Sequence, residues 1–233
     1  MLKQLIRFFF NYELIKTKKT PNLESLLRII FKKNITNVFD VGANVGQFIK
    51  KIRKSGFNGK IYAFEPISTN FEKLKNLKDK NLECYQNGFG IKNQNIAINV
   101  TTGTDLSSIL EPNKQGSKLL GDRINIVRKE IIQIKRFDSF FNPKKHLNNL
   151  LKIDTQGYDL NVLKGASSIL KNINYILIET SFIKIYKDSP DFYEVNKYLN
   201  DNNFYLTNIY PLSKNKEGSI VECDCLYKNI EQI

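Results

Sequence analysis

The chain is poor in the residues that bind metals or form disulfides. Its 233 residues include three cysteines, one histidine, one methionine and no tryptophan. Cys84, Cys223 and Cys225 form no CxxC pair and show no zinc-site spacing. A sparse, odd cysteine count without an export signal is typical of a reducing compartment. We therefore expect no metal site and a cytoplasmic location.

The sequence also lacks an apolar run of the roughly 20 residues that a membrane-spanning helix needs. Residues Leu2 to Phe10 are apolar and basic but too short to span a bilayer, and no small-residue cleavage site follows them. We interpret them as an amphipathic helix in an N-terminal helical segment, residues 1–36, that packs on the domain. A peripheral membrane contact through this basic segment is the alternative.

The charge is strongly of one sign. Thirty-six basic and 23 acidic residues give a formal net charge of +13. Such a balance occurs in proteins that bind nucleic acids. The lysines are scattered in short groups, however, and no arginine-rich block is present. We therefore favour a small-molecule or glycan partner over a nucleic acid.

Apolar periodicity predicts strands that alternate with amphipathic helices, the pattern of a doubly wound, mostly parallel α/β sheet. The predicted strands cover residues 37–41, 60–64, 82–85, 150–154, 175–179, 204–209 and 221–227. Thr69-x-x-Glu72 and Asp191-x-x-Glu194 predict helix capping boxes. Between about 90 and 145 the rhythm breaks, and β segments at 96–101 and 130–137 predict an inserted hairpin or subsheet. Residues 37–233 thus form one domain with an insert.

A glycine turn follows the first predicted strand, where open α/β sheets bind their ligands. In the turn from Asp40 to Gly46, Gly42 lets the backbone approach a ligand closely, and Gly46 lets the next helix press on the strand. Glu65 ends the second strand, and a carboxylate there accepts hydrogen bonds from ribose hydroxyls. These residues predict a nucleoside cofactor.

The residues around the turn select among nucleoside cofactors. Neither the GxGxxG pattern of dinucleotide sites nor a Walker lysine is present. The carboxylate of Asp40 repels a pyrophosphate but suits a ligand with a sulfonium and a free amino group. We therefore expect S-adenosyl-L-methionine, with Asn44 contributing to the same site.

Several motifs together resemble those of FkbM-family methyltransferases over about residues 37–211. They are Asp40-Val-Gly-Ala-Asn-Val-Gly46, Phe64-Glu-Pro66, Lys152-Ile-Asp-Thr-Gln-Gly-Tyr-Asp-Leu-Asn-Val-Leu-Lys-Gly-Ala166, and Ile178-Glu-Thr-Ser-Phe182 with Tyr186. The resemblance implies a Rossmann-like class I fold with a seven-stranded sheet whose last strand is antiparallel. It also implies O-methyl transfer from S-adenosylmethionine, often in glycan or natural-product biosynthesis.

The chain departs from the family pattern at two places. Gln156 stands where many relatives carry glutamate, and the usual serine pair appears here as Ser107 and Ser108 after Asp105-Leu106. Both departures concern the acceptor side of the site more than the cofactor.

Two carboxylates at predicted strand ends are candidates for the general base that methyl transfer to a hydroxyl requires. Asp154 ends the fourth strand and is our first choice; Glu179 ends the fifth and is the second. Asp154 has the alternative of orienting the cofactor's amino group or capping the next helix. Gln156 and Tyr158 are expected to contact the acceptor.

Three further polar residues have smaller predicted roles. Asn87, after the third strand, either reaches the adenine ring or is a turn residue. Asp159 is expected to cap a helix. His146 precedes the fourth strand, far from its carboxyl end, and is interpreted as a loop residue.

The resulting hypothesis is an S-adenosylmethionine-dependent O-methyltransferase that modifies a sugar hydroxyl of a glycan or its activated precursor. The alternatives are an RNA methyltransferase, which the net charge favours, and a cofactor-binding protein without turnover.

Overall fold

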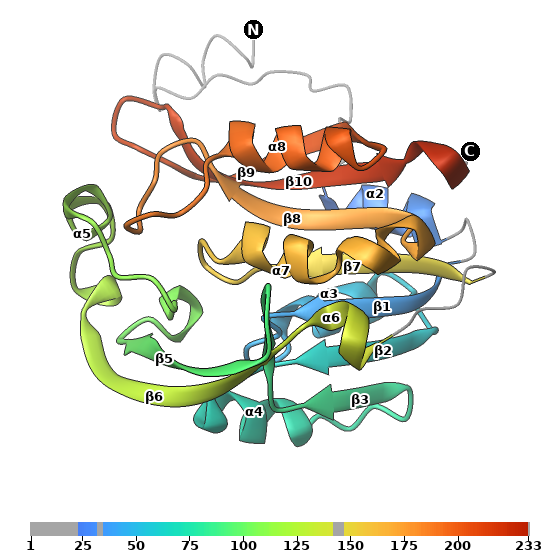
Figure 1. The fold of residues 1–233 in the computed structure, drawn as a ribbon, viewed down its shortest axis with the longest axis horizontal. Helices are drawn as coiled ribbons and strands as arrows, with labels where there is room; N and C mark the ends of the chain where they lie inside the picture. The colour runs from blue at the N-terminus through green and yellow to red at the C-terminus, as the bar shows by residue number, and fades with distance from the viewer. Residues whose placement is uncertain (1–22, 32–34, 142–146, 233) are drawn as a thin grey trace, which may run out of the picture.

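The computed structural model describes residues 23–31, 35–141 and 147–232 (Figure 1). The predicted N-terminal amphipathic helix and His146 lie outside these ranges. No helix within them is long and apolar enough to cross a bilayer.

The centre of the fold is a seven-stranded sheet in the order β3-β2-β1-β7-β8-β10-β9. Its strands are β1 (Ile35–Val41), β2 (Lys60–Phe64), β3 (Leu82–Tyr85), β7 (Asn148–Ile153), β8 (Tyr175–Ser181), β9 (Phe204–Lys214) and β10 (Ile220–Asn229). The pairs from β3 to β8 are parallel, and β10 runs antiparallel to both of its neighbours. The sheet confirms the predicted order of elements and the antiparallel last strand.

Helices cover both faces of this sheet, so most residues of its central strands are buried. One face carries α2 (Leu23–Phe31), α3 (Gln47–Lys54) and α4 (Ser68–Lys75); the other carries α6 (Phe137–Phe140), α7 (Asp159–Gly165) and α8 (Phe192–Asp201). Short 3₁₀ turns add η1 (Thr104–Leu106), η2 (Gly121–Ile124), η3 (Ser167–Asn172) and η4 (Ile230–Gln232). The fold is the predicted doubly wound α/β architecture.

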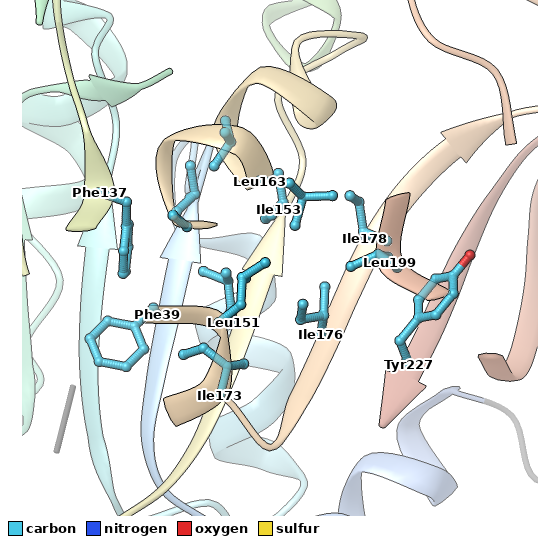
Figure 2. Packing of buried hydrophobic residues seen from close by; sticks show 14 of the residues in the cluster. Phe39, Phe137, Leu151, Ile153, Leu163, Ile173, Ile176, Ile178, Leu199 and Tyr227 are labelled. Carbon is cyan, nitrogen blue, oxygen red and sulfur yellow. The ribbon is translucent and has the colours of Figure 1, made fainter. Parts of the chain in front are cut away.

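Alternation along each strand divides the core into two layers. Phe39 and Leu151 point toward α6 and α7, where they pack with Phe137 and Leu163 (Figure 2). Their neighbour Val38 belongs to the opposite layer beneath α2 and α3. Successive residues along a strand therefore pack against helices on opposite faces of the sheet.

A second, three-stranded sheet forms the predicted insert. Its strands are β4 (Gly88–Phe89), β5 (Gln94–Thr101) and β6 (Ile126–Lys135), in the order β4-β6-β5, and α5 (Lys114–Leu120) lies between β5 and β6 in the chain. Its apolar face contributes Ile98, Ile132 and Ile134 to the cavity described below. The insert therefore covers the carboxyl-end edge of the main sheet.

The two predicted capping boxes have different outcomes. Asp191 and Glu194 form theirs at the start of α8. The box at Thr69 is wrong, because α4 already begins at Ser68 after Ile67 as N-cap. The Ser68 amide donates instead to Glu130 Oε1 of β6, at 2.8 Å. A carboxylate from the insert takes the place of the local cap.

Candidate active site

A cavity of about 290 Å³ opens where the parallel strands end, between the main sheet and the insert. The turn after β1 contributes Gly42, Ala43 and Asn44 to its lining, and Glu65 follows β2. The other main-sheet contributions are Lys152, Asp154, Gln156, Glu179 and Asp224. This is the place at which open α/β sheets bind ligands.

The glycine turn packs directly against the neighbouring strands. Gly42 has φ +81°, and the amides of Gly42 and Ala43 both donate to the Phe64 carbonyl oxygen at 3.0 Å. A Cβ atom at Gly42 would overlap the backbone carbonyl oxygen of Asp154. Only glycine combines this φ with so close an approach of two chain segments.

Replacing Gly42 with alanine should therefore destabilise the protein by more than its backbone conformation alone explains. Gly56 is a matched control, since it has φ +93° and no described heavy atom lies within 4 Å of a Cβ built there. Gly56→Ala should cost about 1–2 kcal/mol for the positive φ. Gly42→Ala should cost roughly 1–3 kcal/mol more, from overpacking. Chemical denaturation measures both, and equal losses would contradict the packing explanation.

Glu65 is nearly buried at the bottom of the cavity, with 4% of its surface exposed. Its Oε2 accepts a hydrogen bond from the Asn44 amide at 2.8 Å, and its Oε1 accepts one from the Ile67 amide at 2.9 Å. Burial raises its pKa to about 7, although these two amides oppose the shift. Its carboxylate oxygens can accept further hydrogen bonds from the hydroxyls of a ligand.

Asn44 offers a second polar group to a ligand. The residue lines the cavity with φ +49°, and its buried Oδ1 has no hydrogen-bond partner among the described residues. A buried oxygen without a partner is costly unless a ligand or water satisfies it. Asn44 and Glu65 therefore fit the hydroxyl and amino groups of a nucleoside cofactor.

The structure corrects the predicted position of Asp40. Its side chain is fully buried and does not line the cavity, because strand parity turns it toward the layer beneath α3. Lys152, its register partner on β7, lies between it and the cavity. The Lys152 Nζ is 3.3 Å from Asp40 Oδ1 and 3.1 Å from Asp154 Oδ2. Asp40 is therefore paired with Lys152 rather than exposed to the cavity.

Lys152 keeps its charge in this buried place. Burial opposes the ammonium ion, but the carboxylates of Asp154 and Asp40 outweigh it and raise the pKa of Lys152 above its ordinary value. Burial in turn raises the pKa of Asp40, which Lys152 counteracts. The ammonium group of Lys152 thus compensates two carboxylates: Asp40, which is buried behind the cavity, and Asp154, which lines it.

Gln156 joins the two candidate bases. Its Nε2 donates to Asp154 Oδ1 at 3.0 Å and to Glu179 Oε1 at 3.1 Å. Its Oε1 lies 3.1 Å from the Tyr186 hydroxyl, which also lies 2.7 Å from the Leu106 carbonyl oxygen. Asp154, Gln156 and Glu179, which come from two separate motifs, therefore meet in one hydrogen-bonded group. An amide suits this place, because its NH₂ donates to both carboxylates.

The serine pair of the insert supports this group. The Ser108 hydroxyl donates to the Gln156 carbonyl oxygen at 2.6 Å and accepts from the Leu110 amide at 3.0 Å. Ser107 lines the cavity and accepts from the Thr101 amide at 3.1 Å. Ser108 thereby ties the insert to the loop after β7.

Glu179 is a strongly perturbed carboxyl group. Burial raises its pKa well above the ordinary value, and the negative charges of Asp154 and Glu222 add to the shift. Glu222 comes from β10, and its own pKa is also raised by burial. Glu179 therefore favours its protonated form, which supports Asp154 over Glu179 as the proton acceptor.

Of the remaining predicted site residues, Tyr158 lines the cavity, whereas Asn87 and Asp159 do not. Asn87 is buried outside the lining and donates to the Gly88 carbonyl oxygen at 3.1 Å, while Gly88 itself lines the cavity. Asp159 is not the N-cap, because Tyr158 holds that position.

The Asp159 carboxylate instead closes the loop before α7. It accepts hydrogen bonds from the Thr155 amide and hydroxyl, both at 2.8 Å, and from the Gly157 amide at 3.0 Å. These bonds hold the loop that carries Gln156.

Sequence reasoning missed Lys152 and Asp224 as site residues. Both could have been found from the sequence, because each is a charged residue inside an apolar run that forms a strand. A charge in such a run is costly unless it is paired or faces a ligand. In the described ranges, no three His, Cys, Asp or Glu side chains are arranged to hold a metal ion.

Comparisons with known proteins agree with this geometry. The Methyltransferase FkbM domain model matches residues 40–206. Methyltransferase 1 of Beauveria bassiana (strain ARSEF 2860) is 22% identical over 185 residues, which cover 72% of this chain and 71% of that protein.

A solved structure shows the same fold. An S-adenosylmethionine-dependent methyltransferase from Mesorhizobium loti has a TM-score of 0.51 at 6% identity, over 88% of this chain and 97% of that chain. Magnesium protoporphyrin IX methyltransferase (ChlM) from Synechocystis PCC 6803, with S-adenosylmethionine bound, has a TM-score of 0.46 at 9% identity, over 97% and 96%. Since the domain model spans more than half of the 233 residues, the resemblance of the motifs is confirmed, and the chain belongs to the FkbM methyltransferase family.

Proposed function

We propose that this protein is an S-adenosylmethionine-dependent O-methyltransferase that acts on a sugar hydroxyl of a glycan or its precursor. One observation carries the proposal: Asp154, directly after β7, and Glu179, near the end of the adjacent parallel strand β8, are joined by Gln156 and line the cavity that also contains Glu65. A nucleoside-binding carboxylate and a candidate base thus share one cavity.

The cavity offers suitable groups to each part of S-adenosylmethionine. Glu65 would accept hydrogen bonds from the ribose hydroxyls, and Asn44 would meet a polar group of the cofactor. The apolar side chains of Ile67, Ile132 and Ile134 would enclose the adenine ring. Bound S-adenosylmethionine supplies the electrophilic methyl group and leaves as its demethylated product.

The chain's own residues then have distinct tasks. The acceptor oxygen must be aligned with the methyl carbon while its proton is removed. Asp154 accepts that proton, and Lys152 and Gln156 hold its two oxygens in place. Gln156 and Tyr158 border the space left for the acceptor.

The acceptor class is tested by incubating the protein with labelled S-adenosylmethionine and separate glycan, lipid and RNA fractions of cells. We expect base-stable label in the glycan fraction. Label confined to RNA would replace this proposal with the RNA alternative. Tight cofactor binding without label in any fraction would indicate a protein without turnover.

The raised pKa of Glu65 predicts a pH dependence of cofactor binding. The ionised carboxylate accepts hydrogen bonds from both ribose hydroxyls, so affinity for the demethylated product should rise as pH increases from about 6 to 8, through the pKa of about 7. Glu65→Gln should remove this dependence, and Glu65→Ala should weaken binding by about 1–3 kcal/mol. Calorimetry at several pH values measures both.

The raised pKa of Glu65 also makes folding stability pH-dependent, but this contribution falls as pH rises, whereas cofactor affinity increases. A carboxyl whose folded pKa lies above its unfolded value of 4.5 contributes stability below pH 4.5, and this contribution is lost as pH rises through about 7. Glu65→Gln should therefore gain stability relative to the native protein near pH 8. Glu217→Gln, in an exposed turn, is the control. If the affinity of the native protein for the demethylated product does not change with pH, the ribose does not bind at Glu65.

A further inference from the structure

Three charged side chains form a row on one face of the main sheet, at the end where the cavity lies. Lys152 is on β7, Glu179 on β8 and Asp224 on β10. Asp224 is the register partner of Glu179, so the two side chains lie side by side on the same face. All three line the cavity.

Asp224 differs from its neighbours because no residue of the described ranges donates a hydrogen bond to its carboxylate. Among the described residues it makes no hydrogen bond and no ion pair, whereas Asp154 and Glu179 both accept from Gln156. Burial raises the pKa of Asp224 to about 6 and the charge of Asp154 adds to the shift, whereas the charges of Lys152 and Lys51 oppose it. A mostly buried carboxylate that lines a cavity without a partner is available to a ligand that donates hydrogen bonds.

Asp224 lies on the far side of the cavity from the predicted ribose site. Four strand spacings separate β2, which leads into Glu65, from β10 in the sheet order. At roughly 4.8 Å each these make about 19 Å. Asp154 and Glu179 lie at the ends of the strands between them. Asp224 therefore belongs to the acceptor end of the cavity.

Acidic side chains outnumber basic ones in the cavity lining, although the whole chain carries +13. Its acidic lining residues are Glu65, Asp105, Asp154, Glu179 and Asp224. Its basic lining residues are Lys51 and Lys152. Lys152 is already shared between Asp40 and Asp154, so it has little charge left for an anionic ligand. The acceptor end thus disfavours a further negative charge.

We propose that Asp224 binds the acceptor and, together with Glu179, selects polyhydroxylated acceptors that are neutral or carry an amino group beside the methylated hydroxyl. Hydroxyl and ammonium groups donate the hydrogen bonds that Asp224 lacks. A phosphate or carboxylate at the same place is repelled by the carboxylates of Asp154 and Asp224. This inference rests on the proposed sugar acceptor and narrows it.

The test compares a neutral methyl glucoside with a methyl glucosaminide, which carries an ammonium group at C2, and a methyl glucuronide, which carries a carboxylate at C6. Their dissociation constants are measured by NMR titration of the full chain saturated with S-adenosylhomocysteine. We expect the glucosaminide to bind at least tenfold more tightly than the glucuronide. Asp224→Asn should shrink this ratio at least threefold, whereas Asp201→Asn, an exposed position on α8, should preserve it. A ratio near one, or one that Asp224→Asn leaves intact, would overturn the proposal.

A second measurement does not depend on the acceptor being a sugar. Sinefungin carries an ammonium group where S-adenosylmethionine carries its methylsulfonium, so its affinity relative to S-adenosylhomocysteine reports the charge next to the acceptor. We expect at least tenfold tighter binding of sinefungin, reduced at least threefold in Glu179→Gln/Asp224→Asn. If the sugars fail to bind but this preference holds, the sugar proposal fails while the charge selection stands. If the double variant leaves the preference unchanged, the charge selection is wrong.

Discussion

Replacing Asp154 with asparagine is expected to lower the rate of methyl transfer about 10²–10⁴-fold, the usual contribution of a general base. The variant keeps the size of the side chain but removes the proton acceptor. The dissociation constant of the cofactor should change little, because Glu65 and Asn44 remain. Single-turnover kinetics and calorimetry on the same variant measure the two quantities separately.

The opposite pattern would assign Asp154 a different role. A raised cofactor dissociation constant with turnover intact at saturation would mean that Asp154 orients the cofactor's amino group. Native values for both would direct attention to Glu179, and Glu179→Gln would then show the loss of rate. Asp201→Asn removes an exposed carboxylate in the same way and should change neither quantity.

Folding must be checked for Asp154→Asn, because its partners are donors. Gln156 Nε2 and Lys152 Nζ approach the two different oxygens of the carboxylate. An asparagine amide presents an oxygen to only one of them. A thermal unfolding midpoint near that of the native protein, with intact cofactor binding, would show that the loss of rate is chemical.

Replacing Lys152 with methionine is expected to destabilise the fold by about 3–5 kcal/mol, because it leaves buried carboxylates without their counter-charge. Asp40 is fully buried and makes no hydrogen bond among the described residues, so the ammonium group of Lys152 is its main compensation. For a chain of this size the midpoint of thermal unfolding should fall by roughly 6–20 °C.

Two comparisons separate a buried charge from lost packing. Asp40→Asn combined with Lys152→Met removes the unpaired charge and should recover part of the lost stability. Lys197→Met breaks an exposed ion pair with Asp201 and should cost no more than about 1 kcal/mol. Equal losses for Lys152→Met and the double variant would show that packing of the lysine stem, rather than its charge, stabilises this layer.

The order of elements and the position of the site could be predicted because both depend on local patterns. Apolar runs of strand length mark the buried strands, and Glu65 follows one of them directly. The role of Gly42 could be predicted without knowing which segments pack against it, because a glycine turn between a strand and a helix indicates a ligand-binding turn by itself. The capping box of α8 is equally local, because Asp191 and Glu194 satisfy each other within one turn.

Side-chain partners depended on contacts between segments far apart in the chain. Thr69 carries the sequence pattern of a cap, yet Glu130, 62 residues away from Ser68, takes that role. Asp40 carries the charge expected of a cofactor ligand, yet the register of β1 against β7 places Lys152 beside it, 112 residues later in the chain. Neither partner has a local signature.

By itself, therefore, the sequence determined the α/β fold, the strand ends that carry Glu65, Asp154 and Glu179, and the glycine turn between β1 and α3. Only the tertiary structure decided which of these charges face the cavity and which are buried behind it. The physical reason is that periodicity assigns a side chain to a face of its own strand, whereas its environment is set by strand order, register and the insert above. Asp40 and Asp224 lie on the same face of one sheet, yet Asp40 is compensated by Lys152, whereas Asp224 lines the cavity, where a ligand can bind it.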